Sequence, residues 1–125
     1  MTALTDYAKN LLARSLTGRQ PSLPTAVWVA LGTGGTDAAG LTGEPATATG
    51  YARQPASFTG SGTQRNAASL RFGFTAAAGT LTHIGIFDAV AGGNALAWAA
   101  LGSPATLGSA GSVTIPAESL TVLAD

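Results

Sequence analysis

The segment Leu81-Thr-His-Ile-Gly-Ile-Phe-Asp-Ala-Val-Ala-Gly-Gly-Asn-Ala-Leu-Ala-Trp-Ala-Ala-Leu101 has the pattern of two β-strands joined by a turn. Its connector contains Asp88, Gly92, Gly93 and Asn94, residue types that favour reversal of the chain. Neither arm has a polar face, as expected of strands that are covered on both sides in a sandwich or barrel. The segment therefore predicts a β-hairpin at the centre of the fold.

Further strands are expected on both sides of this hairpin. With its two arms they make about seven, the others covering residues 26–31, 69–74, 112–115 and 119–123, together with a short strand or bend that opens at 51–53. The intervening stretch 102–112 is expected to form a loop. Turn signals recur at sandwich-like spacing, so we expect a mainly β protein, a β-sandwich or jelly-roll.

One amphipathic α-helix is expected to precede the strands, over about residues 5–17. Apolar residues recur there at the spacing of a single helical face: Leu4, Ala8, Leu11, Leu12 and Leu16. Thr5 is placed to cap the helix, and Gly18 to end it. A helix of this kind buries one face, either on its own sandwich or on a neighbouring subunit, and packing on its own sandwich is the default expectation.

The length and composition fit a single structural domain, residues 1–125, with the sandwich over about residues 26–124. Only 10% of the residues are charged, compared with about 25% in an ordinary domain. A subunit that lies against other subunits can do without charges. Compositional drift in an organism with an Ala- and Gly-rich proteome gives the same shortage.

Charge and cysteine content exclude several classes of partner and site. Six basic and six acidic residues cancel, which argues against nucleic acid as a partner. The absence of cysteine excludes disulfides, thiolate metal sites and thiol nucleophiles. No signal peptide and no apolar run of about 18 residues is found, so no membrane partner is expected.

The residues that could carry catalysis have simpler explanations. No Gly-x-Ser-x-Gly elbow surrounds any serine, and the single histidine, His83, is expected to be a hydrogen-bonded core or interface residue. The glycine-rich stretch Gly32–Asp37 lacks the Lys-Ser/Thr ending of a phosphate-binding loop. Asp88 is expected to bond the backbone of its own turn. We therefore predict no catalytic residue, metal ligand or cofactor.

An interaction site is the remaining kind of function. Residues 32–50 have no periodic apolar pattern, and a connection this long favours a contact loop, although a mobile loop with no specific partner fits as well. The basic residues in the middle third of the chain, Arg53, Arg65 and Arg71, can pair with carboxylates of a partner or lie as solvated charges on the rim of the protein. The candidate interaction residues are Gly34, Asp37, Leu41, Glu44, Arg53, Arg65 and Arg71.

Three aromatic residues, Trp28, Trp98 and Tyr51, can line a ligand groove or a subunit interface. Because they lie on segments expected to be buried, packing in the core is the simpler interpretation.

An ordered set of short motifs resembles a family of small virion proteins of tailed bacteriophages, described as tail-fibre-like, minor structural or head decoration proteins. The motifs are Leu4-Thr-Asp-Tyr-Ala-Lys-Asn-Leu-Leu12, Gly50-Tyr-Ala-Arg53, Thr82-His-Ile-Gly-Ile-Phe-Asp-Ala89, Gly92-Gly93-Asn94 and Ser112-Val-Thr-Ile-Pro-Ala117. The resemblance covers nearly the whole chain. It implies a small β-sandwich subunit, displayed in symmetric copies on the particle, with no catalytic residues to carry over.

The first functional hypothesis is a head decoration or cement protein that binds and stabilises the assembled shell. The second is a component of the tail or tail fibre, including a receptor-binding tip, and the third is a carbohydrate-binding module. Expected partners are other copies of the chain, in a trimer, and the phage major capsid protein or tail proteins. The expected location is the virion, after synthesis in the cytoplasm of the bacterial host.

Overall fold

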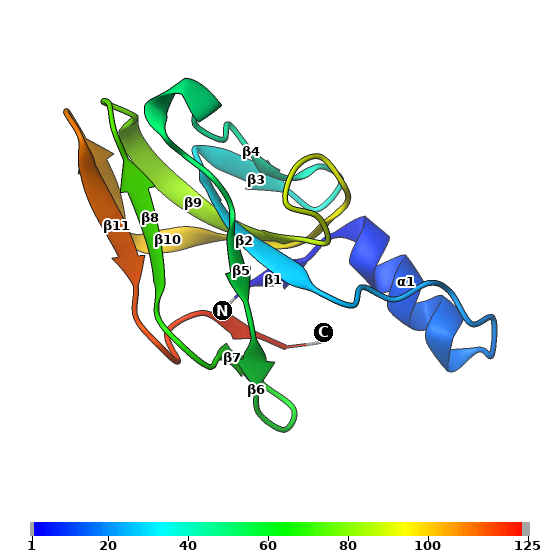
Figure 1. The fold of residues 1–125 in the computed structure, drawn as a ribbon. Coiled ribbons are helices and arrows are strands. Elements are labelled where there is room, and N and C mark those ends of the chain that lie inside the picture. Colours follow the sequence, from blue (N-terminus) through cyan, green and yellow to red (C-terminus); the bar gives the residue numbers. More distant parts are fainter. Residues whose placement is uncertain (1, 124–125) are drawn as a thin grey trace.

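The computed structural model describes residues 2–123, which form antiparallel β-sheets with one helix near the N-terminus (Figure 1). The elements are β1 (Ala3–Leu4), α1 (Asp6–Leu16), β2 (Val27–Gly32), β3 (Gly34–Thr36), β4 (Gly40–Thr42), η1 (Thr47–Thr49), β5 (Gln54–Ala56), β6 (Phe58–Thr59), β7 (Gln64–Asn66), β8 (Leu70–Phe74), β9 (Gly79–Phe87), β10 (Ala95–Leu107), β11 (Gly111–Ile115) and β12 (Thr121–Val122). The predicted mainly β fold with one N-terminal helix is confirmed. The described residues contain more strands than the seven expected, because β1, β3, β4, β6 and β7 are too short to show an alternating pattern.

The hairpin of β9 and β10 lies in the middle of the largest sheet, as predicted. That sheet has the order β1-β10-β9-β2-β5, so each long strand of the hairpin has a neighbour on its other side. Ile84 and Ile86 are buried on one face of β9, and Leu81, Gly85 and Phe87 on the other. Both faces of the strand are therefore covered, which explains why neither face carries mainly polar side chains.

Strand β10 is longer than expected because it continues after an interruption. Its pairing passes from Ala100 opposite His83 to Ala105 opposite Leu81, so four residues of β10 lie where β9 has a single residue. These four residues include a glycine and a proline, which weaken a strand pattern in the sequence. The prediction of a loop over 102–112 was therefore wrong for its first half.

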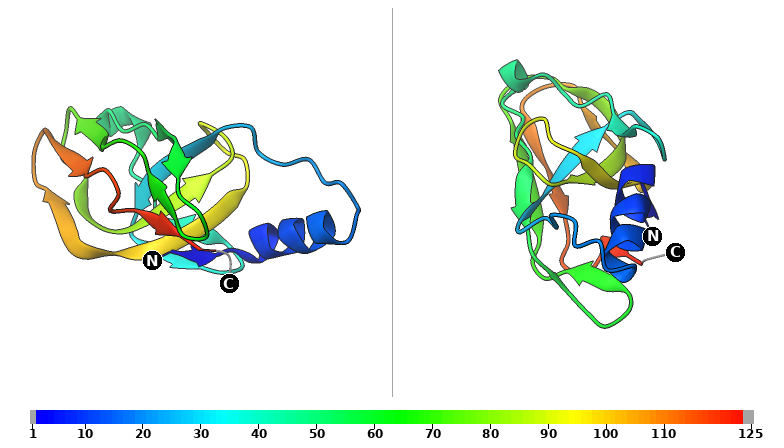
Figure 2. Two further views of the ribbon diagram at one scale, coloured as in Figure 1. Left: turned by 90° about the horizontal axis from the view of Figure 1, so that it is seen from below. Right: turned by 90° about the vertical axis from the view of Figure 1, so that its right-hand side faces the viewer.

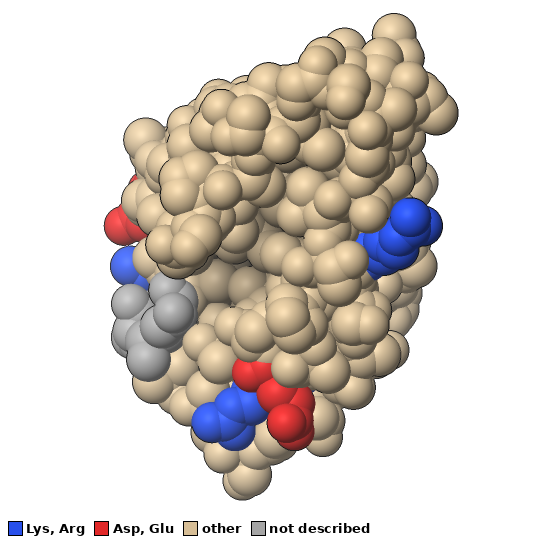
Figure 3. All heavy atoms as spheres, turned by 90° about the vertical axis from the view of Figure 1, so that its left-hand side faces the viewer, with Lys and Arg blue, Asp and Glu red and all other residues tan. Residues whose placement is uncertain are grey.

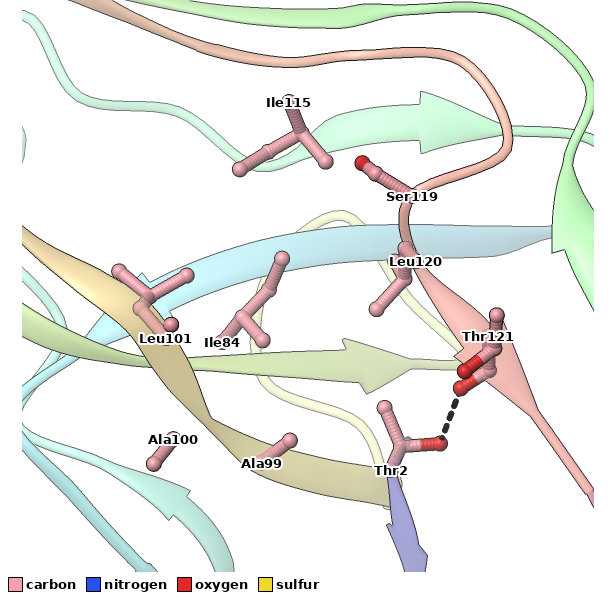
Figure 4. Close-up of a pocket in the computed structure, with 10 residues that line it drawn as sticks. Thr2, Ile84, Ala99, Ala100, Leu101, Ile115, Ser119, Leu120 and Thr121 are labelled. Atoms are coloured by element: carbon pink, nitrogen blue, oxygen red, sulfur yellow. Dashed lines mark hydrogen bonds between the residues drawn. The ribbon is translucent and has the colours of Figure 1, made fainter.

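A second layer of strands faces the central sheet. It consists of the β8–β11 pair and of the sheet β12-β7-β6. Ile84 of the central sheet lines the same hollow as Ile115 and Leu120 of this layer, and Figure 4 shows their side chains approaching it from opposite sides. Phe72 of β8 is fully buried in the same core, beside the ring of Tyr51. This layering agrees with the sandwich expected from the sequence.

The helix begins where the sequence predicts. The Thr5 side chain accepts a hydrogen bond from the backbone N–H of Ala8 (3.2 Å) and donates one to the carbonyl of Ala95 (2.7 Å). The first bond caps the helix, and the second ties its start to the central sheet. Gly18, with φ of 77°, follows the last turn in a conformation that favours glycine.

Only the first turns of α1 pack on the body of the protein. Ala8 and Leu11 are buried, whereas Leu16 in the last turn is 87% exposed. Figure 2 shows the helix extending beyond the sheets, with the chain returning beside it toward β2. The expectation that the helix packs on its own sandwich is therefore correct for its first half.

Candidate functional site

The segment 32–50, expected to lack regular structure, contains a small β-hairpin. Strands β3 and β4 pair from Gly34–Thr42 to Thr36–Gly40, and the turn of 3-10 helix η1 follows. Leu41 is buried over Gly85 of β9, on the face of the central sheet that points away from the second layer. The prediction of a structureless loop was wrong, because strands of three residues rich in glycine show no periodicity. Leu41, a candidate interaction residue, holds this hairpin on the sheet.

The absence of a side chain at Gly85 makes this contact possible. A Cβ at that position would lie 2.6 Å from the Cβ of Leu41 and 3.3 Å from the carbonyl of Ala97. Gly85→Ala is therefore expected to push the β3–β4 hairpin away and to lower the free energy of unfolding by about 1–3 kcal/mol, measured by urea denaturation. Gly73→Ala is the matched control, since nothing lies within 4 Å of its Cβ position. Equal stability of the two variants would contradict this packing.

The tip of the hairpin holds Trp98 of β10. The Nε1 of Trp98 donates a hydrogen bond to Oδ1 of Asp37 (2.9 Å), and Gly35 lies directly against the indole ring. His83 also stacks on the Trp98 ring, with centroids 6.2 Å apart, and its Nδ1 is 2.8 Å from the hydroxyl of Thr82. His83 thus has a hydrogen-bonding partner, as predicted, and Trp98 is half-buried between strand and hairpin.

A partly buried ion pair joins the end of segment 32–50 to the residues before β5. Nη2 of Arg53 donates to Oε1 of Glu44 (2.7 Å) and its Nε donates to Oε2 (3.0 Å). The hydroxyl of Tyr51 also donates to Oε2 of Glu44 (2.6 Å) and accepts from the backbone N–H of Leu31 (3.2 Å). The Arg53 side chain is 7% exposed and that of Glu44 is 26% exposed. The carboxylate is therefore held by three donors, in a bidentate geometry that suits arginine.

The same guanidinium fixes the β9–β10 turn. Nη1 of Arg53 donates to the carbonyls of Ala89 (2.9 Å) and Gly92 (2.8 Å), and the group lies 3.7 Å above the ring centre of Phe87. All of these contacts lie within the protein, so the interpretation of Arg53 as a solvated rim charge was wrong. Arg53 and Glu44 instead connect the end of segment 32–50 to the β9–β10 turn.

The network changes the ionisation of its members. Burial raises the pKa of Glu44, but the hydrogen bonds from Arg53 and Tyr51 and the charge of Arg53 outweigh it, so the net pKa is lowered from 4.5. The hydrogen bond to Glu44 raises the pKa of Arg53, and this effect exceeds the lowering caused by burial. Burial, followed by the hydrogen bond to Glu44, raises the pKa of Tyr51. At neutral pH the pair is thus charged and the phenol is neutral.

The lowered pKa of Glu44 predicts a loss of stability in acid. Its contribution is fully present above the ordinary pKa of 4.5 and disappears as the pH falls through the lower pKa of the folded protein. We expect Glu44→Gln to be less stable than the wild type at neutral pH, and the difference to shrink below pH 4.5. Urea denaturation of both proteins over this range measures it. A difference that stays constant with pH would contradict the role of this carboxylate.

The β9–β10 turn is closed by Asp88, as the sequence predicts. Its Oδ1 accepts a hydrogen bond from the backbone N–H of Asn94 (2.7 Å), and its Oδ2 accepts one from the side chain of the same residue (3.1 Å). Asp88 therefore stabilises its own turn.

The other candidate interaction residues lie apart from this network. Gly34 is half-buried in β3, Asp37 is exposed at the tip of the hairpin, and Arg65 and Arg71 are exposed on β7 and β8. The structure does not bring them together into one site. Their contact with a partner stays a prediction.

The aromatic residues differ in exposure. Tyr51 is buried, and its ring stacks on Phe72 and Phe74, so it offers no platform to a sugar ring. Trp28 and Trp98 are half-buried, so the simple interpretation of core packing is correct for Tyr51 and incomplete for the tryptophans.

Asn66 of β7 is a structural residue that the sequence does not reveal. It is fully buried, and its amide donates to the carbonyls of Ala68 (3.0 Å) and Pro116 (2.9 Å) and accepts from the N–H of Leu120 (2.9 Å). These bonds fix the connection from β11 to β12. An isolated asparagine between turn residues is more typical of an exposed turn, so no local signal could have found it.

The hollow between the layers is small, and the polar side chains that line it are hydroxyls. Its volume is about 250 Å³, and the residues that line it include Thr2, Ile84, Leu101, Ile115 and Leu120 (Figure 4). None of its lining residues is titratable. Figure 3 shows the end of the protein that carries β8 and β11, with few charged side chains around its central depression.

Residues 2–123 contain neither a cluster of metal-ligating side chains nor a membrane-spanning helix. No group of three or more histidine, aspartate or glutamate side chains there could hold a metal ion. No helix in this range is long and apolar enough to cross a membrane.

Comparison with protein families gives one match that spans nearly the whole chain. A family model described as Gp80, podophage GP4 fiber I protein gp80, matches residues 3–123. The chain belongs to this fibre protein family. No curated protein sequence matches it.

Membership of the fibre protein family confirms the resemblance to tail-fibre-like structural proteins of bacteriophages. It agrees with a structural role in the virion and with association with other virion components. The motifs that carry the resemblance lie in α1, before β5, in the central hairpin and in β11, so they mark the framework of the fold.

Proposed function

We propose that the protein is a non-enzymatic structural subunit of a phage tail fibre. The observation that carries this proposal is the match of the fibre protein family over residues 3–123. The description of that family favours a fibre over the head decoration protein that the sequence placed first. Virion tail proteins and other copies of the chain are the partners that this function implies.

The geometry supports a structural role. Polar side chains that could serve in catalysis are engaged by the protein itself: Arg53 by Glu44, Asp88 by Asn94, and His83 by Thr82. A nucleophile oriented by a base and a third group is the arrangement that hydrolytic chemistry needs, and the hydrogen bonds of these residues form no such chain. Their bonds instead fix the turns around the central hairpin.

Fractionation of the particle tests this proposal. Heads and tails of purified virions would be separated, and the protein quantified in each fraction against the major capsid protein. A fibre subunit is expected in the tail fraction, at a few copies per particle. Recovery with the heads at hundreds of copies would overturn the proposal in favour of a decoration protein.

A further inference from the structure

The β3–β4 hairpin is attached to the rest of the protein by few contacts. Residues 33–44, which we call the lid, leave the central sheet after Gly32 at the end of β2. Strands β3 and β4 pair with each other, and within residues 2–123 they share no ladder of backbone hydrogen bonds with the central sheet (Figure 1). Of the lid residues only Gly40 and Leu41 are buried. Because an isolated two-stranded hairpin is marginally stable in water, the lid depends on its attachments.

Neutral donors hold the start and the tip of the lid. At the start, the hydroxyl of Thr82 donates to the carbonyl of Thr33 (3.0 Å). At the tip, the side chain of Asp37 accepts from Nε1 of Trp98 (2.9 Å), and its carbonyl accepts from the N–H of Asp6 (2.8 Å). Thr33 and Asp37 are exposed, so water competes for these bonds and each contributes a modest amount.

The end of the lid is held by a charged group. The carboxylate of Glu44 accepts hydrogen bonds from Nη2 and Nε of Arg53 (2.7 and 3.0 Å) and from the hydroxyl of Tyr51 (2.6 Å). Since Arg53 also donates to the β9–β10 turn, this carboxylate ties the lid to the body of the protein. Hydrogen bonds between charged groups are roughly twice as strong as neutral ones. The pair of Glu44 and Arg53 is therefore the strongest polar attachment of the lid.

Protonation of Glu44 weakens this attachment. A protonated carboxyl has no charge for the guanidinium and turns one acceptor oxygen into a donor, whereas Arg53 and Tyr51 bring donors toward it. Burial raises the pKa of Glu44, but the bonds from Arg53 and Tyr51 outweigh burial, so the pKa is lowered. The attachment is thus complete above the ordinary pKa of 4.5 and is lost as the pH falls through the lower pKa of the folded protein.

The titratable groups around Glu44 do not replace it in this role. Burial raises the pKa of Tyr51, and the hydrogen bond to Glu44 raises that of Arg53, so both groups keep their protons in acid. Asp88 adds its negative charge near Arg53 from the β9–β10 turn, where its oxygens are bonded to Asn94. At this end of the lid, the group that both titrates in acid and holds the lid is Glu44.

The tip of the lid has titratable neighbours of its own and covers an aromatic side chain. Asp6 lies beside Asp37, and His83 stacks on the indole of Trp98. Gly35 of the lid lies directly against the same indole. Opening of the lid therefore uncovers Trp98.

We propose that residues 33–44 form an acid-released lid, which leaves the central sheet when Glu44 is protonated and exposes Trp98 while the sheets stay folded. A segment with few buried contacts opens at a lower free energy than the core of the same protein. Glu44 sets that free energy by joining the end of the lid to Arg53. The opening does not depend on whether the subunit is placed in the tail or the head. It can fail while the proposed function stands, and the reverse.

Hydrogen exchange of the wild-type chain, measured by NMR, tests whether the lid opens separately. The indole N–H of Trp98 and the backbone N–H of Asp6 are bonded to the lid, whereas Ile84 lies in the middle of the central sheet. After correction for intrinsic rates, the two groups at the lid are expected to exchange at least about tenfold faster than the N–H of Ile84. Their exchange is expected to speed up as the pH falls below 4.5. Equal rates for all three would overturn the proposal, since the lid would then open only when the whole protein unfolds.

Substitutions identify the group that releases the lid. Glu44→Gln is expected to raise the exchange rate of the Trp98 indole at neutral pH at least about tenfold and to remove its acid response. Asp37→Asn keeps an oxygen for the indole N–H but does not titrate, so the acid response is expected to persist. Glu118→Gln, at an exposed position between β11 and β12, is the matched control and is expected to behave as the wild type. Circular dichroism would show that the variants are folded. An acid response in Glu44→Gln equal to that of the wild type would contradict the role given to this carboxylate.

Discussion

Arg53→Met is expected to lower the free energy of unfolding by about 3 kcal/mol, because it removes the buried member of a partly buried ion pair together with the donor to two carbonyls. The methionine keeps most of the apolar length of the side chain but leaves the carboxylate of Glu44 without its charged partner. It also leaves the carbonyls of Ala89 and Gly92 without their donor. The β9–β10 turn and the end of segment 32–50 lose their connection together. Urea denaturation at neutral pH measures the change.

Two further variants separate the ion pair from a general effect of charge. Arg71→Met removes an exposed base from β8 and is expected to change stability by less than about 0.5 kcal/mol. Combining Arg53→Met with Glu44→Gln is expected to restore part of the loss, because no buried carboxylate is then left uncompensated. If Arg53→Met and Arg71→Met were equally stable, the Glu44–Arg53 pair would not stabilise the fold as we expect.

Asn66→Ala is expected to have the second large effect, a loss of about 3 kcal/mol. The alanine leaves the N–H of Leu120 and the carbonyls of Ala68 and Pro116 without the partners that the amide supplies. Each buried polar group left unsatisfied costs about 1–3 kcal/mol, partly reduced where water can reach it. Because these bonds join β7 to the connection before β12, we expect faster hydrogen exchange there, which mass spectrometry can follow.

The matched control for this variant is Asn10→Ala. Asn10 is exposed on α1, and alanine favours a helix, so stability is expected to stay the same or rise slightly. Thermal unfolding of both variants against the wild type measures the contrast. A loss at Asn66 no larger than that at Asn10 would show that water replaces the amide, which would contradict its structural role.

Local patterns were sufficient to predict the centre of the fold. The hairpin from Leu81 to Leu101 is apolar on both faces, and alternation within one strand is a property of the strand itself. The helix cap at Thr5 and the closing of the turn by Asp88 also depend on residues close in sequence. Each of these features could therefore be predicted without knowledge of the other strands.

Contacts between distant segments could not be predicted in the same way. The β3–β4 hairpin is held by Leu41 over Gly85, residues that are far apart in the chain and carry no common pattern. The ion pair of Glu44 and Arg53 spans a turn with no helical or strand period, so opposite charges nine residues apart gave no signal. Candidate interaction residues in this region were therefore a mixture of exposed and internal side chains.

Helix α1 also shows the difference between features set by local sequence and features set by distant segments. Its amphipathic period predicts a helix that buries one face, and this is correct for the first turns of α1. How far the sheet extends beneath the helix depends on the lengths of β1 and β10, which no local pattern sets. Only the structure shows that Leu16 and Leu23 extend beyond the body of the protein.

Electron microscopy of the complete particle, compared with particles that lack this protein, tests the central claim most directly. The difference map is expected to show density for the mainly β subunit on the tail, at a few symmetric positions, with none over the shell of the head. Density repeated across the capsid lattice would contradict the assignment to a tail fibre.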